Sequence, residues 1–306
     1  FFILHTVSES SWQTLSGKPP VVIARGGFSG VFQDSSNKAY ELVSVTISLN
    51  VALWCDLQLA KDGVGICFLD LNLDNGSDVT GPNKKEWFSV DFTWKDLSDV
   101  NCECTTTLFH LNPLLSPVKF FKIEMFNLKF SIIPTRYLTV KNVAELGAPG
   151  LWLRIHTQLI FFFFLLNSNT YRTVLSTRNI TYEKLCCRFI KTRENQLPEK
   201  HEKDVTKLIF SHPTNQTYGS LAKNLSYIKT FSSGILVPKY YIWPVGSDLY
   251  LKPHTSLVTD AHKQDLQIFA SEFANDFYLS FIDNGNFSVD GFLSDFPVTP
   301  YRAISK

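Results

Sequence analysis

An arginine and two glycines directly follow a short apolar run near the start of the chain. Val21–Ala24 is typical of a buried strand, and Arg25 comes at the point where that strand ends. Glycine lets the backbone turn sharply or approach a ligand closely, and a guanidinium can donate two parallel hydrogen bonds to a phosphate. The sequence therefore predicts an anion site at Arg25. The alternative is a structural ion pair between Arg25 and Asp56 or Asp70.

The next predicted strand, Val51–Leu59, is apolar apart from one acid and a glutamine. Lys61–Gly63 predicts a tight turn, after which Val64–Asp70 returns as the following strand. Cys55 and Cys67 lie on these two strands. They either face each other as a disulfide or remain two buried thiols.

The rest of the chain alternates between short apolar stretches and segments with helical spacing. We expect strands at 150–155, 207–211, 234–238, 266–270 and 287–297, and helices at 35–45, 138–146 and 257–265. Asp34 or Ser35 is expected to cap the first helix, and Asp295 a turn before Pro297. Short strands separated by helices predict a parallel sheet, and at 306 residues a (β/α)8 barrel of the TIM type is favoured.

Composition indicates one large globular domain and gives no reason to expect a nucleic-acid partner. The chain is 44% hydrophobic and 19% charged, and its net charge is +1. Its 6 cysteines do not have the spacing of a zinc site. Asn-x-Ser/Thr sequons begin at Asn75, Asn179, Asn215, Asn224 and Asn286. Because such sites are glycosylated only in the secretory pathway, they favour a secreted protein.

Several motifs together resemble the glycerophosphodiester phosphodiesterase family. They are Ala24-Arg25-Gly26, Asp34-Ser35-Ser36, the stretch from Cys55 to Gly63, Phe68-Leu69-Asp70 and the stretch from Val289 to Pro297. The family pattern at these places is His-Arg-Gly, Glu-Asn-Thr, Glu-x-Asp with a Thr-x-Asp-Gly turn, His-Asp, and Val-Asp-Gly-x-x-Thr-Asp-x-Pro. The segments 19–36, 54–68, 87–93 and 218–238 further resemble the first lobe of plant glycerophosphodiester phosphodiesterase-like proteins, which are secreted, two-lobed and tethered by a lipid anchor.

The resemblance implies a barrel that splits phosphodiesters with two acid/base histidines and a divalent cation, calcium or magnesium. Neither family histidine is present, because Ala24 and Leu69 stand at those positions. Arg25 would hold the substrate phosphate.

The cation ligands implied by the resemblance are also changed. Asp56 and Asp34 remain as candidate ligands, whereas Trp54 replaces the first carboxylate and His156 the third. Asp70 lies beside the second histidine position.

Outside the family pattern, His254 is the first candidate for a replacement base. The alternative is an ordinary histidine in a surface loop.

Two stretches, 101–134 and 157–200, do not match the family pattern, so we expect the barrel to be irregular there. Their Phe, Leu, Ile, Asn and Lys-rich composition is typical of translated non-coding sequence. The longest apolar run, 159–166, is too short to span a bilayer. We predict an N-terminal tail at 1–18 and a barrel domain at 19–302, with any membrane anchor outside this segment.

The sequence thus leaves two hypotheses about function. One is a phosphodiesterase that hydrolyses glycerophosphodiesters to an alcohol and glycerol 3-phosphate. The other is a catalytically impaired barrel that binds a phosphate or glycan and serves in the organisation of the cell surface or cell wall. For both, a small-molecule ligand and an extracellular location are expected.

Overall fold

A computed structural model describes most of the predicted barrel. The described residues are 12–46, 51–70, 72, 73, 77, 87–102, 135–155, 187–190, 207–211, 218–274 and 277–305. Residues 103–134 and most of 157–200 lie outside them, as does the apolar run 159–166. Among the described residues, no helix is long and apolar enough to cross a membrane.

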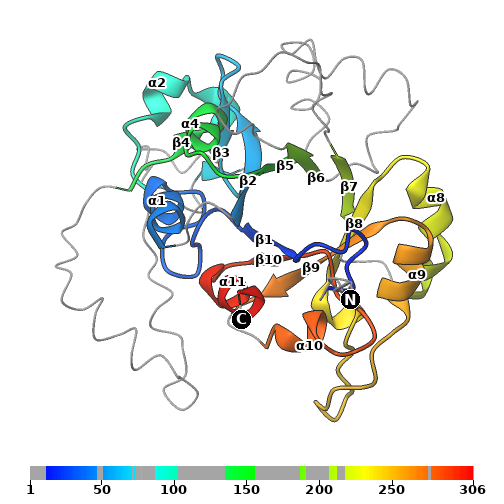
Figure 1. The fold of residues 1–306 in the computed structure, drawn as a ribbon. Coiled ribbons are helices and arrows are strands. Elements are labelled where there is room, and N and C mark those ends of the chain that lie inside the picture. Colours follow the sequence, from blue (N-terminus) through cyan, green and yellow to red (C-terminus); the bar gives the residue numbers. More distant parts are fainter. Residues whose placement is uncertain are drawn as a thin grey trace, which may run out of the picture.

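The strands of the described part curl into a ring that closes on itself (Figure 1). The ring consists of β1 (Val21–Ala24), β2 (Val51–Leu59), β5 (Leu151–Ile155), β6 (Cys187–Ile190), β7 (Lys207–Ser211), β8 (Gly234–Pro238), β9 (Gln267–Phe273) and β10 (Gly291–Ser294). β1 pairs with β10 on one side and β2 on the other, which closes the barrel. The prediction of a TIM-type barrel is confirmed.

One strand departs from the regular pattern of this barrel. β6 runs antiparallel to both of its neighbours, β5 and β7, whereas the other pairings of the ring are parallel. A regular barrel of this type has parallel strands throughout. The irregularity falls within 157–200, one of the two places where the sequence predicts it.

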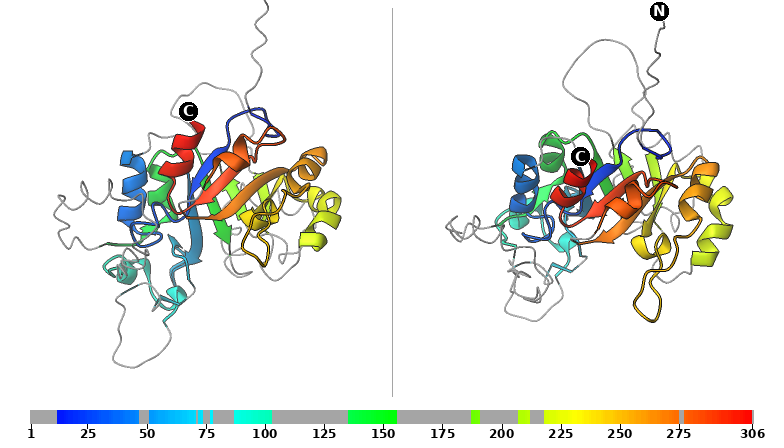
Figure 2. Two further views of the ribbon diagram at one scale, coloured as in Figure 1. Left: turned by 90° about the horizontal axis from the view of Figure 1, so that it is seen from below. Right: turned by 60° about the horizontal axis from the view of Figure 1, so that its bottom comes forward.

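Helices pack on the outside of the ring, with α1 and α11 on one side and α8 and α9 on the other (Figure 2). The longer ones are α1 (Asn37–Thr46), α4 (Val140–Glu145), α7 (Tyr218–Lys223), α8 (Leu225–Lys229), α9 (Leu257–Lys263) and α11 (Val298–Ile304). Single-turn helices are η2 (Ser89–Asp91), α2 (Trp94–Leu97), η5 (Lys239–Tyr241) and α10 (Leu279–Ile282). The sequence does not predict the helices α7, α8 and α11.

Alternation along the strands divides the apolar residues between two cores. Residues of one parity point into the barrel, where they form a separate cluster: Ile23, Ala52, Trp54, Trp152, Ile209, Leu236, Phe269 and Leu293. Residues of the other parity face the helices outside, as Leu53 and Cys55 do on β2. Because Asp56 has the parity of Trp54, it belongs to the interior face.

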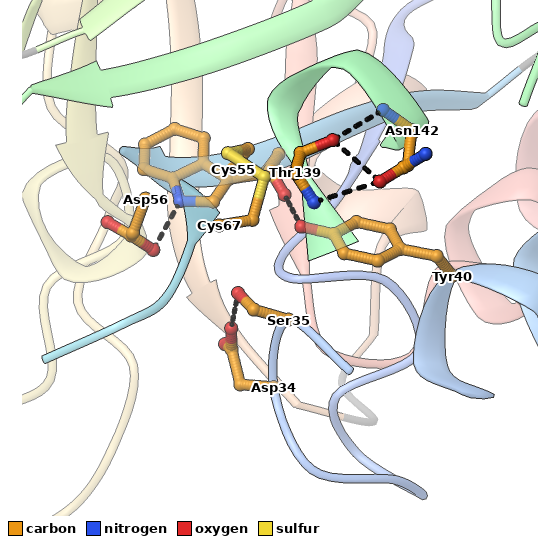
Figure 3. The surroundings of a disulfide bond; sticks show 9 residues. Asp34, Ser35, Tyr40, Cys55, Asp56, Cys67, Thr139 and Asn142 are labelled. Atoms are coloured by element: carbon orange, nitrogen blue, oxygen red, sulfur yellow. Dashed lines mark hydrogen bonds between the residues drawn. A yellow bond between two sulfur atoms is a disulfide. The ribbon is translucent and has the colours of Figure 1, made fainter. Parts of the chain in front are cut away.

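The strand β2 continues beyond the barrel into a hairpin. β3 (Gly65–Cys67) folds back antiparallel to β2, and β4 (Leu138–Thr139) pairs with β3. The predicted strand 64–70 is therefore confined to three residues. Cys55 and Cys67 form a disulfide across this hairpin (Figure 3), which settles the alternative that the sequence leaves open.

Two predicted caps are wrong. The helix α1 begins at Asn37, and its N-terminus is capped by Ser36, whose Oγ accepts from Ala39 N at 3.2 Å. Asp34 is turned away into the barrel mouth, as described below. Before Pro297, Ser294 Oγ accepts from Phe296 N at 3.1 Å and so stabilises the turn expected of Asp295.

The end of the predicted N-terminal tail is fixed against the barrel. Leu15 N donates to Asp290 Oδ1 at 2.9 Å, and Gln13 N to Ser288 Oγ at 3.0 Å. Asp290 also accepts from Ile268 N at 2.8 Å, so one buried carboxylate joins this segment to β9 and β10.

The disulfide gives a testable contribution to stability. The bridged residues are 12 apart, and a loop of that size stabilises a protein by about 3 kcal/mol, chiefly through the unfolded chain. We predict that Cys55→Ala/Cys67→Ala lowers the free energy of unfolding by this amount in urea. Dithiothreitol should destabilise the natural protein to a similar degree and leave the double variant unchanged. Equal sensitivity of both proteins to the reductant would contradict the assignment.

Candidate functional site

Polar side chains gather where β1, β2 and β5 end, at the carboxyl edge of the barrel. Arg25 directly follows β1, Asp34 lies in the loop before α1, and Asp56 is on β2. Arg154, on β5, is paired in register with Asp56. Arg154 is missing from the residues that the sequence predicts for this site. Its parity with Trp152 is the signal that places it on the interior face.

The carboxylate of Asp56 is completely buried, with an exposed fraction of 0%. The Trp54 indole Nε1 donates to Asp56 Oδ2 at 2.8 Å (Figure 3), and Arg154 Nη1 lies 3.4 Å from Oδ1. Trp54 stacks on Trp152 with ring centroids 6.0 Å apart. Trp54 stands where the family pattern has a carboxylate. Its indole instead donates a hydrogen bond to the carboxylate that is kept, Asp56.

The guanidinium of Arg25 is paired with Asp295, which follows β10. Arg25 Nε lies 2.6 Å from Asp295 Oδ1, and Ser29 Oγ donates to the same oxygen at 3.1 Å. Arg25 therefore does form an ion pair, but its partner is Asp295, and the expectation of Asp56 or Asp70 as the partner is wrong. Burial lowers the pKa of this guanidinium, but the charges of Asp295, Asp34 and Asp56 outweigh burial and raise the pKa.

The Asp34 carboxylate lies in a space that a glycine leaves open. A Cβ at Gly26, which has φ +52°, would collide with the Asp34 carboxylate, and Ser35 N donates to Gly26 O at 2.8 Å. Asp34 Oδ1 accepts from Ser35 Oγ at 2.6 Å. Its other oxygen, Oδ2, is buried and has no hydrogen-bond partner among the described residues. Burial, followed by the charge of Asp56, raises the pKa of Asp34 to about 6.

Tyr40, on α1, connects this loop to β2. Its hydroxyl donates to Trp54 O at 2.8 Å, and burial followed by the charge of Asp34 raises the pKa of the phenol (Figure 3). Gly27 allows the close approach, because a Cβ there, at φ +84°, would meet the backbone of Ala39 and Tyr40. Gly27 therefore lets the loop pack closely against α1.

Neither family histidine position offers a proton carrier. Ala24 is buried at the end of β1, and Leu69 lies after β3 with a partly exposed side chain. The neighbouring Asp70 is exposed and accepts from Asn72 N at 3.4 Å. His156 lies outside the described residues.

His254 belongs to an aromatic cluster on the outer side of the barrel wall. Its ring meets Trp243 and Phe287 edge-on, each at 5.2 Å between centroids, and Phe287 belongs to the core between strands and helices. His254 Nδ1 lies 3.1 Å from Thr255 O. His254 thus lies half-buried in the loop before α9, away from Arg25 and Asp56, which agrees with the alternative of a loop histidine rather than with a replacement base.

A further buried polar residue is missing from the sequence prediction. Gln58 is two positions beyond Asp56 on the same face of β2 and is 1% exposed. Both atoms of its side-chain amide lack a partner among the described residues. Since an unpaired buried amide is costly, it indicates a polar ligand or ordered water nearby.

The raised pKa of Asp34 predicts how stability depends on pH. The folded state binds the carboxyl proton more tightly than the unfolded chain, so stability falls as pH rises from about 4 to about 6. We predict that Asp34→Asn, which still accepts from Ser35, gains up to about 3 kcal/mol at pH 8 and nothing at pH 4. Urea denaturation across this range measures the difference, with exposed Asp283→Asn as control. A difference independent of pH would contradict the raised pKa of Asp34.

No protein-family model matches this chain. Curated relatives do. The chain is 55% identical over 332 residues to glycerophosphodiester phosphodiesterase GDPDL5 of Arabidopsis thaliana, covering 100% of the chain and 42% of that protein. It is 40% identical over 328 residues to GDPDL3 of the same plant, covering 95% and 40%. The chain thus spans about two fifths of the length of these relatives.

The barrel is also similar to solved structures. One is a putative glycerophosphoryl diester phosphodiesterase from Silicibacter pomeroyi, with TM-score 0.56 and 15% identity over 97% of this chain and 98% of that one. Another is an Oleispira antarctica phosphodiesterase in complex with its product sn-glycerol-3-phosphate, with TM-score 0.51 and 15% identity over 96% and 100%. At such identities the likeness shows the fold.

The curated relatives match along the whole chain, and the barrel has the fold of the solved enzymes. This chain is therefore a domain of the glycerophosphodiester phosphodiesterase family, related to the plant glycerophosphodiester phosphodiesterase-like proteins.

Proposed function

We propose that this domain binds the phosphate of a glycerophosphodiester, or of glycerol 3-phosphate, and hydrolyses the diester slowly or not at all. The observation that carries the proposal is the set of residues at the end of β1 and at the second family histidine position. Arg25 is held there by Asp295 through Nε, while Ala24 and Leu69 stand where the family pattern has histidine.

The placement of Arg25 supports phosphate binding. Asp295 engages Nε on one edge of the guanidinium, so the two terminal nitrogens remain on its outer edge, and the side chain is 40% exposed. Two parallel donors match two oxygens of a phosphate. The Oleispira antarctica phosphodiesterase, which shares the fold, is described in complex with sn-glycerol-3-phosphate, and this is consistent with such a ligand.

The missing proton carriers support impaired hydrolysis. Cleavage of a phosphodiester needs a base for the attacking oxygen and an acid for the leaving oxygen, and each contributes roughly 10²- to 10⁴-fold. An alanine and a leucine can supply neither.

The family's divalent cation does not fit the described residues. Hard cations take six or more oxygen ligands. Trp54 offers none, and Asp56 is already engaged by an indole and a guanidinium. No group of three or more His, Cys, Asp or Glu side chains suited to a metal occurs in the part of the chain that the structure describes.

Turnover and binding together test the proposal. With glycerophosphocholine and added calcium or magnesium, we expect the natural domain to be no faster than Arg25→Ala. In calorimetric titrations with sn-glycerol 3-phosphate, Arg25→Ala should weaken binding about tenfold or more, since it removes charge-assisted hydrogen bonds. Arg302→Ala, on the exposed surface of α11, is the matched control. Metal-dependent turnover lost in both Arg25→Ala and Asp56→Ala would instead identify an active enzyme.

We also propose that the domain works outside the cell, as a glycoprotein of the cell surface or wall. The Cys55–Cys67 disulfide supports an oxidising compartment, where such bridges persist. Two of the five sequons have described acceptors, and both Asn224 and Asn286 are exposed. Asn224 lies just before α8 and Asn286 in the loop before β10, so both can be glycosylated in the folded domain.

Glycan attachment can be measured directly. Protein produced through a plant secretory pathway should migrate faster on gels after enzymatic removal of N-glycans. Asn224→Gln and Asn286→Gln should each remove one glycan without loss of folding, and mass spectrometry of the peptides would confirm the positions. Unmodified asparagine at both positions in the secreted protein would count against this part of the proposal.

A further inference from the structure

The environment of Asp56 places a positive side chain where the family resemblance implies a metal ion. Arg154 Nη1 lies 3.4 Å from Asp56 Oδ1, and the two residues are partners in the parallel register of β2 and β5. The Asp56 side chain is fully buried, whereas that of Arg154 is 35% exposed. The guanidinium therefore reaches from the buried carboxylate toward the solvent at the barrel mouth.

A divalent cation at Asp56 would have to share that carboxylate with Arg154. The other oxygen accepts from the Trp54 indole, whose N–H has no lone pair to offer a metal. A cation bound at Oδ1 would lie beside a like charge in a site of low dielectric, where repulsion is strong. The donor set thus suits a guanidinium better than calcium or magnesium.

We propose that Arg154 takes the place of the divalent cation, so that the site binds phosphate esters between Arg25 and Arg154 without a metal. This inference rests on the proposed phosphate-binding function and adds how the charge of the ligand is balanced.

The strand order puts the two arginines on either side of Asp56. β2 lies between β1 and β5, and neighbouring strands are about 4.8 Å apart. Arg25 is close enough to Asp56 for the carboxylate to influence its pKa. A phosphate over the Asp56 position would therefore meet one guanidinium on each side. The charge of Arg154 acts at the barrel mouth whatever hydrogen bonds its other donors make.

Unsatisfied polar atoms near this position support a polar ligand. Asp34 Oδ2 and both amide atoms of Gln58 are buried without partners among the described residues. Asp34 follows the strand that leads to Arg25, and Gln58 shares the face of Asp56. A ligand bearing hydroxyl groups and phosphate oxygens offers both acceptors and donors to such atoms.

Calorimetry with sn-glycerol 3-phosphate tests the inference. We expect the dissociation constant in EDTA to agree within about twofold with that in calcium or magnesium. Binding that requires either metal would overturn the inference and leave the proposed function standing. No binding under any condition would overturn the proposed function itself.

The variant Asp56→Asn distinguishes a cation held by Asp56 from a charge supplied by Arg154, because the two predict opposite effects on binding affinity. If Asp56 held a needed cation, this change would abolish binding. If Arg154 supplies the charge, removing its carboxylate partner leaves the guanidinium less neutralised, and binding should be unchanged or several-fold tighter. The double variant Asp56→Asn/Arg154→Met should then lose about tenfold or more relative to Asp56→Asn. Thermal melting checks that each variant is folded, and Arg302→Met on the outer helix is the control. Retained affinity in the folded double variant would contradict a role for Arg154.

Discussion

A single buried carboxylate constrains the centre of this barrel. Asp56 is fully buried, and its charge is balanced by Arg154 on the neighbouring strand and by the indole of Trp54. Removing Arg154 would leave the buried carboxylate without a compensating charge. The pair also links β2 to β5 at a position where the two residues are partners in the strand register.

Around this carboxylate, backbone geometry arranges the remaining charges. The two glycines after β1 let the loop fold back so that the Asp34 carboxylate enters the mouth and α1 approaches the strand. Closure of the ring brings β10 beside β1, and Asp295 then aligns the guanidinium of Arg25. The result is the anion site that we propose, which has no histidine at either family position. Such a site fits the binding of a phosphate ester better than its cleavage.

Much of the fold follows from patterns that are local in sequence. Apolar runs mark the strands β1, β2, β5, β7, β8 and β9, because a barrel strand faces the packed interior on one side and the outer helices on the other. The direction of β6 has no such signal, since the same apolar run can pair either way. The cap of α1 shows another limit. Asp34, Ser35 and Ser36 all have capping side chains, and tertiary burial decides which one faces the helix.

The candidate site is only partly predictable for a similar reason. Arg25 and Asp56 are recognisable from the strand ends on which they lie. The partner of Arg25 is not, because Asp295 is 270 positions away and approaches only when the barrel closes. In the sequence, Arg154 is a single charge in an apolar strand. That it lies beside Asp56 depends on the register between β5 and β2. Pairings between distant strands are set by the whole sheet, so they cannot be derived from spacing alone.

The most direct measurement of the account is a crystal structure of the domain grown with sn-glycerol 3-phosphate and calcium. We predict density for the phosphate in contact with the guanidinium groups of Arg25 and Arg154. We also predict that Asp56 keeps its hydrogen bonds to Trp54 Nε1 and Arg154, with no ion between the carboxylate and the phosphate. A calcium ion that joins Asp34 and Asp56 to the phosphate, with Arg154 displaced, would contradict it.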